Sequence, residues 1–186
     1  VCSADLQQLE REIHEINTSI KVIYQVADCT KETDLTSFAS KVREGFGRLD
    51  VAVVSAGVAP RFQVDPDTKE NAWPQGLLGD TTEEFMRVFN INFYGSYLSA
   101  RAFLPLLRET KQGVQALLFL SSISALFESD TLTPFSYNVS KMGINQLAEF
   151  IHRAHHGEGI VTHAFHPGGI ATPLTVDYPK IWKSSK

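Results

Sequence analysis

Short apolar runs alternate with amphipathic segments along most of this chain, and this alternation constrains the fold more than any other feature. Runs rich in β-branched and aliphatic side chains predict strands at residues 20–26, 49–54, 114–120 and 160–165. Apolar residues spaced three or four positions apart predict helices at residues 1–18, 35–46, 81–106 and 137–156. Strands separated by helices pair in parallel through right-handed crossovers. The sequence therefore predicts an α/β fold, a doubly wound parallel sheet flanked by helices.

The composition fits one domain of this kind. The chain has 186 residues, of which 43% are hydrophobic, so we expect one core and a single domain over residues 1–186. Residues 58–80 interrupt the alternation with three prolines, two glycines and several charges, and we expect a long surface loop there. A net charge of -4 without a basic run argues against a nucleic-acid or membrane-surface partner.

The cysteines and histidines give little sign of a metal or disulfide site. Cys2 and Cys29 make neither a disulfide framework nor a metal site, which fits a reduced, cytoplasmic setting. No apolar run approaches the roughly 20 residues that a membrane span needs. His152, His155 and His156 are close in sequence, but no Cys or acidic residue is spaced to complete a ligand set. We therefore expect a solvated helix end there and no metal.

Small and polar residues close each predicted strand, at Asp28, Ser55-Ala56-Gly57, Ser121-Ser122 and Pro167-Gly168-Gly169. The carboxyl ends of parallel strands share one edge of the sheet, where ligands bind. Glycines at such points let a flat ligand approach the backbone closely. Strand-to-helix turns need small and polar residues in any case, so each position alone is also explained by its turn.

Tyr137 and Lys141 stand four residues apart at the start of a predicted helix. Residues at i and i+4 lie on one face of a helix, so a phenol and an ammonium would project side by side. The positive charge favours the phenolate and lowers the pKa of the tyrosine toward a range useful for proton transfer. Amphipathic helices also carry this pair by chance, so its meaning depends on the other motifs.

In order and spacing, the motifs resemble those of short-chain dehydrogenases/reductases of the classical type, whose fold is Rossmann-like. The resemblance covers residues 20–175. It rests on Asp28, on Asn92-Phe93-Tyr94-Gly95, on Leu120-Ser121-Ser122-Ile123-Ser124, on Tyr137 and Lys141 with Ser140 before the lysine, and on Pro167-Gly168-Gly169-Ile170-Ala171-Thr172.

The resemblance implies four catalytic residues. Tyr137 would give a proton to a ketone oxygen that receives hydride, or remove one in the oxidative direction, and Lys141 would lower the pKa of that tyrosine and hold the nicotinamide ribose. Ser122 would hydrogen-bond the substrate oxygen, and Asn92 would position a water in a proton relay. The strand end favours Ser122 as the active-site serine, while the usual loop length favours Ser124, so both stay open.

The resemblance also implies NADP or NAD as cofactor, because no side chain stores a hydride. The cofactor-binding residues would be Asp28, Ala56, Gly57, Asn92, Tyr137, Lys141, Pro167, Gly168, Ile170 and Thr172. Asp5, near the expected end of the preceding strand, favours NAD, since an acid there bonds the ribose 2′-hydroxyl. Reductases of the family favour NADP, so the choice stays open.

The sequence departs from the family pattern at three points. It contains no Thr-Gly-x-x-x-Gly-x-Gly loop, the device that cradles the cofactor pyrophosphate at a helix N-terminus. The family's Asn-Asn-Ala-Gly is here Val54-Ser55-Ala56-Gly57, and the sequence stops soon after Thr172. Because the first residue is Val, we expect a fragment, truncated at the N-terminal side and at the C-terminal side.

Two functions of different classes are consistent with these patterns. The first is an NAD(P)-dependent oxidoreductase acting on a carbonyl or secondary alcohol of a small organic molecule, such as an apolar compound or a secondary metabolite. By resemblance it would form a homodimer or homotetramer. The second is a truncated, catalytically silent family member that acts in binding or interaction. Phe62, Trp73 and Leu77 would either line an apolar substrate site or anchor the 58–80 loop.

Overall fold

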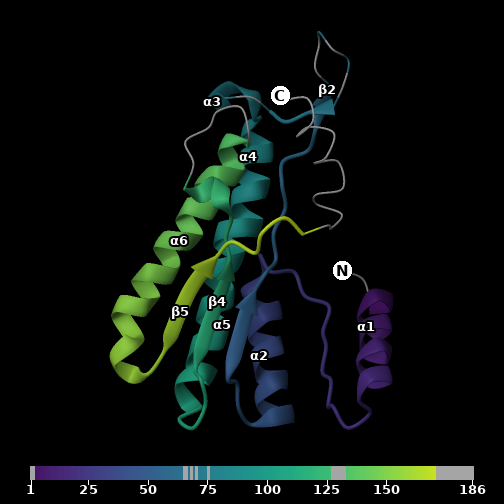
Figure 1. Cartoon of the computed structure of the whole chain (residues 1–186), viewed down its shortest axis with the longest axis vertical. Coiled ribbons are helices and arrows are strands. Elements are labelled where there is room, and N and C mark those ends of the chain that lie inside the picture. Colours follow the sequence, from purple (N-terminus) through teal and green to yellow (C-terminus); the bar gives the residue numbers. More distant parts are fainter. Residues whose placement is uncertain are drawn as a thin grey trace.

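The structure is a computed structural model that describes residues 3–64, 67, 69, 71–74, 76–126 and 133–170. Helices and strands alternate along much of it (Figure 1). In chain order the elements are α1 (Ser3–Ile16), α2 (Glu32–Phe46), β1 (Val51–Val54), β2 (Gln63–Val64), β3 (Asn71–Ala72), α3 (Gly76–Gly79), α4 (Thr82–Phe89), the π-helix η1 (Asn90–Tyr94), α5 (Gly95–Glu109), β4 (Ala116–Leu120), the 3₁₀-helix η2 (Ile123–Ala125), α6 (Phe135–His155), the 3₁₀-helix η3 (His156–Glu158) and β5 (Val161–Phe165).

The main sheet is parallel, which confirms the predicted α/β class. Its strand order is β1-β4-β5. Ala116 at the start of β4 is in register with Val51 of β1 and with Val161 of β5. The three strands therefore begin at one edge and end together at the opposite edge (Figure 1). The sheet with its flanking helices is the predicted Rossmann-like arrangement.

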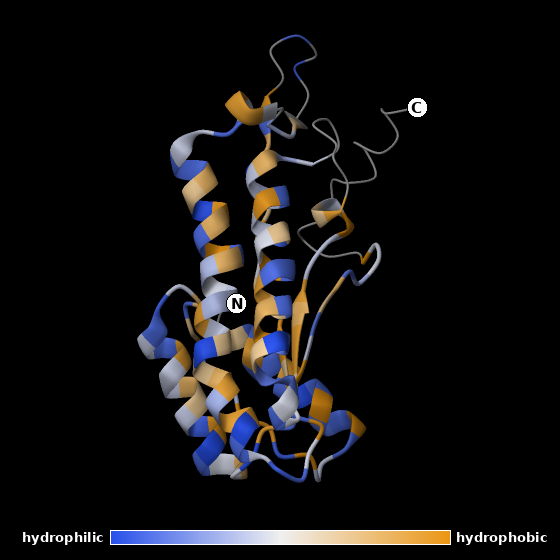
Figure 2. Cartoon of the chain, turned by 90° about the vertical axis from the view of Figure 1, so that its left-hand side faces the viewer, coloured by the Kyte–Doolittle hydropathy of each residue, from blue (hydrophilic) through white to orange (hydrophobic). Residues whose placement is uncertain are grey.

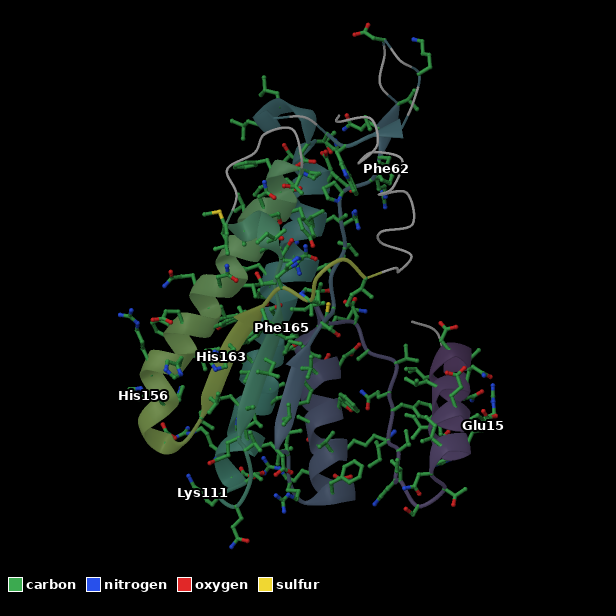
Figure 3. The ribbon with its side chains drawn as sticks, in the orientation of Figure 1. Glu15, Phe62, Lys111, His156, His163 and Phe165 are labelled. Atoms are coloured by element: carbon green, nitrogen blue, oxygen red, sulfur yellow. The ribbon has the colours of Figure 1, made fainter. Side chains whose placement is uncertain are left out.

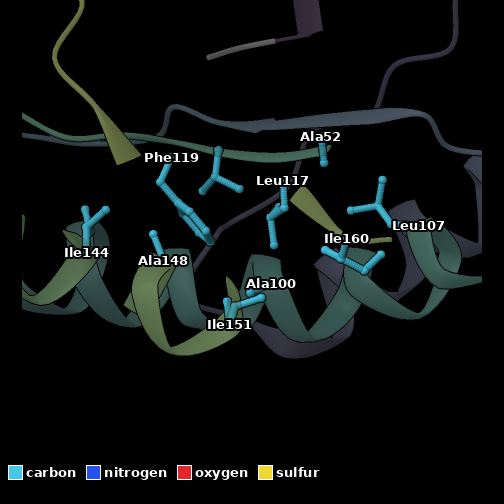
Figure 4. Packing of buried hydrophobic residues seen from close by; sticks show 10 residues of the cluster. Ala52, Ala100, Leu107, Leu117, Phe119, Ile144, Ala148, Ile151 and Ile160 are labelled. Carbon is cyan, nitrogen blue, oxygen red and sulfur yellow. The ribbon is translucent and has the colours of Figure 1, made fainter. Parts of the chain in front are cut away.

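The core lies between the sheet and the two long helices α5 and α6 (Figure 4). Its members from the strands and these helices are Ala52, Val54, Leu117 and Phe119 of β1 and β4, Ala100 and Leu107 of α5, and Ile144, Ala148 and Ile151 of α6. Strand residues alternate between the two faces of a sheet. Val51 and Val53, on the other face of β1, are accordingly 43% and 56% exposed. Figure 2 shows the resulting pattern, with apolar strands beside helices of mixed hydropathy.

The strand predicted at residues 20–26 is wrong. The segment runs without strand structure beside α2, because none of the strands that the structure describes lies next to it to share ladder hydrogen bonds. Side chains fasten it to α2 in place of a ladder: Lys21 Nζ donates to the Gly45 carbonyl at 2.6 Å, and Lys41 Nζ donates to the Tyr24 carbonyl at 2.9 Å. β-branched content thus predicted extended backbone and left the pairing partner undetermined.

The interpretation of residues 1–5 as the end of a strand also changes. Asp5 lies in the first turn of α1, and Val1 and Cys2 fall outside the described residues. The helix predicted for residues 1–18 is confirmed in position. Figure 1 shows α1 at the outer end of the molecule, on the far side of the 20–26 segment from α2.

The described residues of the 58–80 segment and the helix after them contain elements that the sequence did not predict. β2 and β3 form a short antiparallel pair, and Phe62 stacks on Trp73 with ring centroids 4.1 Å apart. The helix predicted from residue 81 begins as expected, with Thr81 as N-cap, whose hydroxyl accepts from Glu84 N at 3.2 Å. It is not continuous α-helix, however, because the π-helix η1 separates α4 from α5.

His152 and His155 lie at the end of α6, His156 begins η3 and His163 lies on β5; Figure 3 labels His156 and His163. The His152 ring is 5.5 Å from that of His156 and 6.4 Å from that of His163, centroid to centroid. His155 Nδ1 lies 2.9 Å from a Glu158 oxygen. Within the part of the chain that the structure describes, no group of three His, Cys, Asp or Glu residues is placed to hold a metal ion. The helices in that part include none with the length and apolar character needed to cross a bilayer.

Candidate functional site

The carboxyl ends of the three parallel strands bring most of the predicted site residues to one edge. β1 leads into Ala56-Gly57, β4 into Ser121-Ser122 and β5 into Pro167-Gly168. Ser121 N donates to the Phe165 carbonyl at 2.8 Å, which fastens the ends of β4 and β5 together. Parallel strands with crossover helices place these turns side by side, as the sequence predicted.

Asn92 lies in η1 and is fully buried, at 0% exposure. Its Oδ1 accepts from Val58 N at 2.8 Å, while its Nδ2 donates to Val58 O at 2.9 Å and to Ser140 Oγ at 3.0 Å. A buried amide needs such partners, because an unbonded polar atom in the interior costs free energy. Asn92 therefore joins the turn after β1 to the helix that carries Tyr137.

The π-helix that holds Asn92 was not predicted from the sequence. Gly95 N donates to the Asn90 carbonyl, five residues back, which is the π-helical pattern. A Cβ on Gly95 would lie 2.9 Å from Cys29 Sγ, so only glycine lets the segment before α2 pass this close to η1. Such π turns occur often at functional sites. Gly95 was the one residue in the sequence that could have indicated this close packing, and it was interpreted only as part of the motif Asn92-Phe93-Tyr94-Gly95.

Lys141 is buried at 4% exposure on α6, below the carboxyl end of β4. Its Nζ donates to the Leu120 carbonyl at 2.8 Å and lies 5.6 Å from the centroid of the Tyr137 ring. Burial lowers the pKa of Lys141 to about 8, because the low-dielectric interior disfavours the ammonium. The predicted pairing of Tyr137 and Lys141 on one helix face thus exists in the structure.

Gly57 brings the backbone of the turn after β1 close to Asn92 and Lys141. A Cβ at Gly57 would lie 3.3 Å from Asn92 Oδ1 and 3.5 Å from Lys141 Nζ. Ala56 and Gly57 are both exposed, so their backbone remains accessible. The turn after β1, the π-helix and α6 therefore converge at one point.

Tyr137 lies in the first turn of α6 and is half-buried. Its carbonyl accepts from Ser140 Oγ at 2.7 Å, and Ser140 is also the hydroxyl that Asn92 contacts. The N-cap residue of α6, Pro134, offers no side-chain cap, but Asp80 Oδ2 accepts from Ser136 N at 3.1 Å. Ser140 was identified from the sequence only as part of the family motif and Asp80 was not identified, since both act through contacts between distant segments.

The structure places the two candidate serines differently. Ser122 follows β4 directly and is half-buried, and its Oγ accepts from Ser124 N at 3.2 Å and from Ser124 Oγ at 2.9 Å. Ser124 is buried at 4% exposure. With its oxygen accepting from Ser124, the Ser122 hydroxyl proton remains available to another acceptor.

Asp28 and the residues after β5 do not join this buried cluster. The exposed Asp28 carboxylate accepts from Thr30 N at 3.0 Å and Thr30 Oγ1 at 2.7 Å, and these hydrogen bonds are the main cause that lowers its pKa. Gly168 has a positive φ of 87°, and Ile170 is 53% exposed. Pro167 is half-buried. Thr172 lies outside the described residues.

Comparisons with known proteins agree with this fold. The family model described as short chain dehydrogenase matches residues 1–180. The short chain dehydrogenase pigC of Monascus ruber is 34% identical over 147 residues, which cover 79% of this chain and 43% of pigC. The short chain dehydrogenase tazN of Aspergillus terreus is 32% identical over 174 residues, covering 92% of this chain and 35% of tazN. The chain thus spans half or less of the length of these two curated relatives.

Solved structures show the same fold at lower identity. Levodione reductase superposes with a TM-score of 0.80 at 23% identity, over 99% of this chain and 65% of that one. A short-chain type dehydrogenase/reductase from Mycobacterium marinum superposes with a TM-score of 0.81 at 22% identity, over 98% and 67%. At such identities the likeness concerns the fold alone.

Proposed function

This chain belongs to the short-chain dehydrogenase family, and on that premise we propose that it is part of an NAD(P)-dependent oxidoreductase. The enzyme transfers hydride between a nicotinamide cofactor and a carbonyl or secondary alcohol of a small organic molecule. The observation that carries the proposal is the convergence of Gly57, Asn92 and Lys141 beside Tyr137 at the carboxyl edge of the sheet. Strand ends of this kind are where open α/β sheets bind ligands.

The residues at this edge fit the nicotinamide half of the cofactor. Lys141 Nζ has three N–H groups, of which the Leu120 carbonyl takes one, so others can bond ribose hydroxyls. Gly57 lacks the Cβ that would crowd the same space, and Ala56 beside it is exposed. A bound nicotinamide cofactor supplies the hydride.

Proton transfer is the part that this chain's own side chains perform. Tyr137 gives its phenolic proton to the substrate oxygen in reduction, and the Lys141 ammonium stabilises the phenolate left behind. Ser122 donates its free hydroxyl proton to the same oxygen, which holds the substrate for the transfer. Ser122 is preferred to Ser124 because Ser124 is buried and already donates to it. Asn92 holds the turn after β1 against α6, and Ser140 completes that link.

The substrate is proposed to be apolar. Apolar side chains are exposed on segments that follow the carboxyl ends of β4 and β5: Ile123 at 42%, Leu126 at 75% and Ile170 at 53%. Trp73, by contrast, is 5% exposed and stacked on Phe62, which supports the reading that these aromatics anchor the 58–80 segment. Exposed apolar side chains beside a polar reaction centre favour a substrate with an apolar body.

From membership of the same family we also propose that the protein assembles into a homodimer or homotetramer. Tyr94, Tyr97, Met142 and Phe150 are exposed on η1, α5 and α6, in the part of the molecule that would pair in a homodimer or homotetramer. Light scattering on the full-length protein would report its mass directly, and a monomer at micromolar concentration would contradict this assignment.

Replacing Tyr137 by Phe tests the proposed function. In the full-length protein, with NADPH and phenanthrenequinone as substrates, we expect turnover to fall by about 10³-fold, within the range of an acid/base group, while NADPH affinity changes less than about twofold. Tyr24→Phe is the matched control, because Tyr24 lies beside α2 and its one described hydrogen bond is to its carbonyl, from Lys41. Normal turnover in Tyr137→Phe would refute the proton-transfer role. A parent protein that binds neither NADPH nor NADH, and turns over with neither, would favour the silent binding protein instead.

A further inference from the structure

The backbone of residues 58–61 is held by side chains of α4 and η1 rather than by its own hydrogen bonds. Asn92 binds both polar groups of Val58, at 2.8 Å and 2.9 Å. Arg87 Nη2 donates to the Ala59 carbonyl at 2.8 Å, and Glu84 Oε1 accepts from Arg61 N at 2.7 Å. Irregular backbone must find partners outside itself, so these three side chains define its path.

We propose that Glu84 and Arg87 are positioning residues, which hold the 58–61 segment against α4 and so fix the substrate-facing side of the site next to Gly57. This inference rests on the proposed function for its kinetic part. Among the interactions of the described residues, no hydrogen bond or ion pair joins Glu84 or Arg87 to the four proposed catalytic residues.

The geometry of the pair supports this role. Arg87 Nε donates to Glu84 Oε2 at 3.0 Å, and Arg87 Nη2 donates to Glu84 Oε1 at 2.6 Å, which is the two-pronged contact of a guanidinium with a carboxylate. The side chains are only 14% and 27% exposed, for Glu84 and Arg87 respectively. The hydrogen bonds from Arg87 are the largest cause that lowers the pKa of Glu84. Removing Arg87 would leave the partly buried Glu84 carboxylate with only the exposed guanidinium of Arg61, 3.9 Å away, as a charged partner.

The helix itself does not require this pair. α4 has its own N-cap at Thr81, and a charged pair three residues apart adds only about 0.2–0.5 kcal/mol to a helix by itself. Each member of the pair instead makes a further bond to the 58–61 backbone, where Pro60 is buried and has no N–H to bond. The pair therefore ties two segments together.

The 58–61 segment lies between Gly57, which belongs to the candidate site, and Phe62. Gly57 precedes the segment. A Cβ at Gly57 would lie 3.3 Å from Asn92 Oδ1 and 3.5 Å from Lys141 Nζ. Phe62 follows the segment and stacks on Trp73 (Figure 3 labels Phe62). A shift of the segment would move Gly57 and the Val58 backbone that Asn92 holds, and with them the backbone that lies close to Lys141 Nζ.

The test replaces Arg87 by Met, which keeps the length of the side chain and its helix propensity but removes every donor. In the full-length protein we expect the Arg61 amide to exchange with deuterium about tenfold faster, because its acceptor is no longer held in place. We expect KM for phenanthrenequinone to rise about tenfold, with kcat and the NADPH dissociation constant each within about twofold. Glu84→Gln keeps an oxygen for Arg61 N and should show a smaller rise in KM.

The matched control is Arg101→Met. Arg101 pairs with Glu32 at 3.2 Å between α5 and α2, with both side chains 55% exposed, so neither the exchange of Arg61 nor KM should change. Wild-type exchange and wild-type KM in Arg87→Met would overturn the proposal, as would a uniform loss of kcat and NADPH binding. If the parent protein neither binds NADPH or NADH nor turns over with them, the proposed function fails, and the exchange rates alone decide whether Glu84 and Arg87 hold the 58–61 segment.

Discussion

Two parts of the predicted site are built in opposite ways. Asn92 and Lys141 are buried, and their bonds join residues far apart in the chain: Asn92 to Ser140, and Lys141 to the Leu120 carbonyl. Asp28 is exposed and bonds residues two and three positions away, Thr30 and Lys31. The first group depends on the tertiary packing, while the second is a turn that forms locally. Substitutions should therefore have very different consequences in the two places.

The largest effect on stability is expected for Asn92→Ala. The change removes three hydrogen bonds from a fully buried side chain and leaves the polar groups of Val58 without partners. We expect a loss of about 3 kcal/mol in the free energy of unfolding, measured by urea denaturation. Asn145→Ala is the control, since its side chain takes one described bond, from Ser121. Equal losses in the two variants would show that the three hydrogen bonds of Asn92 stabilise the fold no more than the one described bond of Asn145.

Lys141→Met should stabilise the protein and abolish turnover. Burial lowers the pKa of Lys141 to about 8 from 10.5. Below pH 8 the side chain is charged in both the folded and the unfolded protein, and burying that charge destabilises the folded state. At about 1.4 kcal/mol per pKa unit this costs about 3 kcal/mol, and the lost bond to Leu120 offsets about 1, so we expect a gain of about 2 kcal/mol at pH 7.

The pH dependence checks the cause of that gain. Between pH 8 and 10.5 the unfolded wild-type chain binds more protons than the folded chain, so wild-type stability rises with pH in this window. The advantage of Lys141→Met should therefore shrink from pH 8 upward. Urea midpoints of the two proteins across this range would show it, and a constant difference would rule out the buried charge as its origin.

Asp80→Ala should have a smaller effect, through the first turn of α6. Asp80 Oδ2 caps Ser136 N, one residue before Tyr137, where Pro134 provides no side-chain cap. Loss of such a cap costs about 1 kcal/mol in the free energy of unfolding. Asp80→Asn keeps an oxygen acceptor and should restore most of it. A deficit in the asparagine variant as large as that in the alanine variant would exclude the cap as the reason.

The smallest effect on stability is expected for Asp28→Ala. The side chain is exposed and its contacts stay within one turn, so the urea midpoint should be unchanged. If Asp28 contacts the adenine end of the cofactor, the NADPH dissociation constant should rise about threefold, as for one exposed polar contact. Unchanged affinity would remove Asp28 from the cofactor-binding residues and leave it as a turn former.

Much of the fold could be predicted from local patterns. Apolar runs predicted β1, β4 and β5, and helical spacing predicted α1, α2 and α6, because burial on one face imposes a period on the sequence. The same reasoning failed at residues 20–26, where extended propensity was present but no neighbouring strand was described. It also missed η1, since a π turn depends on the packing of Gly95 against Cys29.

The sequence by itself determined the α/β class, the residue types at the strand ends, and the pairing of Tyr137 with Lys141, because helix geometry fixes the i, i+4 relation. Only the tertiary structure decided which of these residues meet. It buried Asn92 between Val58 and Ser140, lowered the pKa of Lys141 by desolvation, and turned Glu84 and Arg87 toward the 58–61 backbone. Those contacts join segments that no local pattern relates, and their strength comes from exclusion of water on folding.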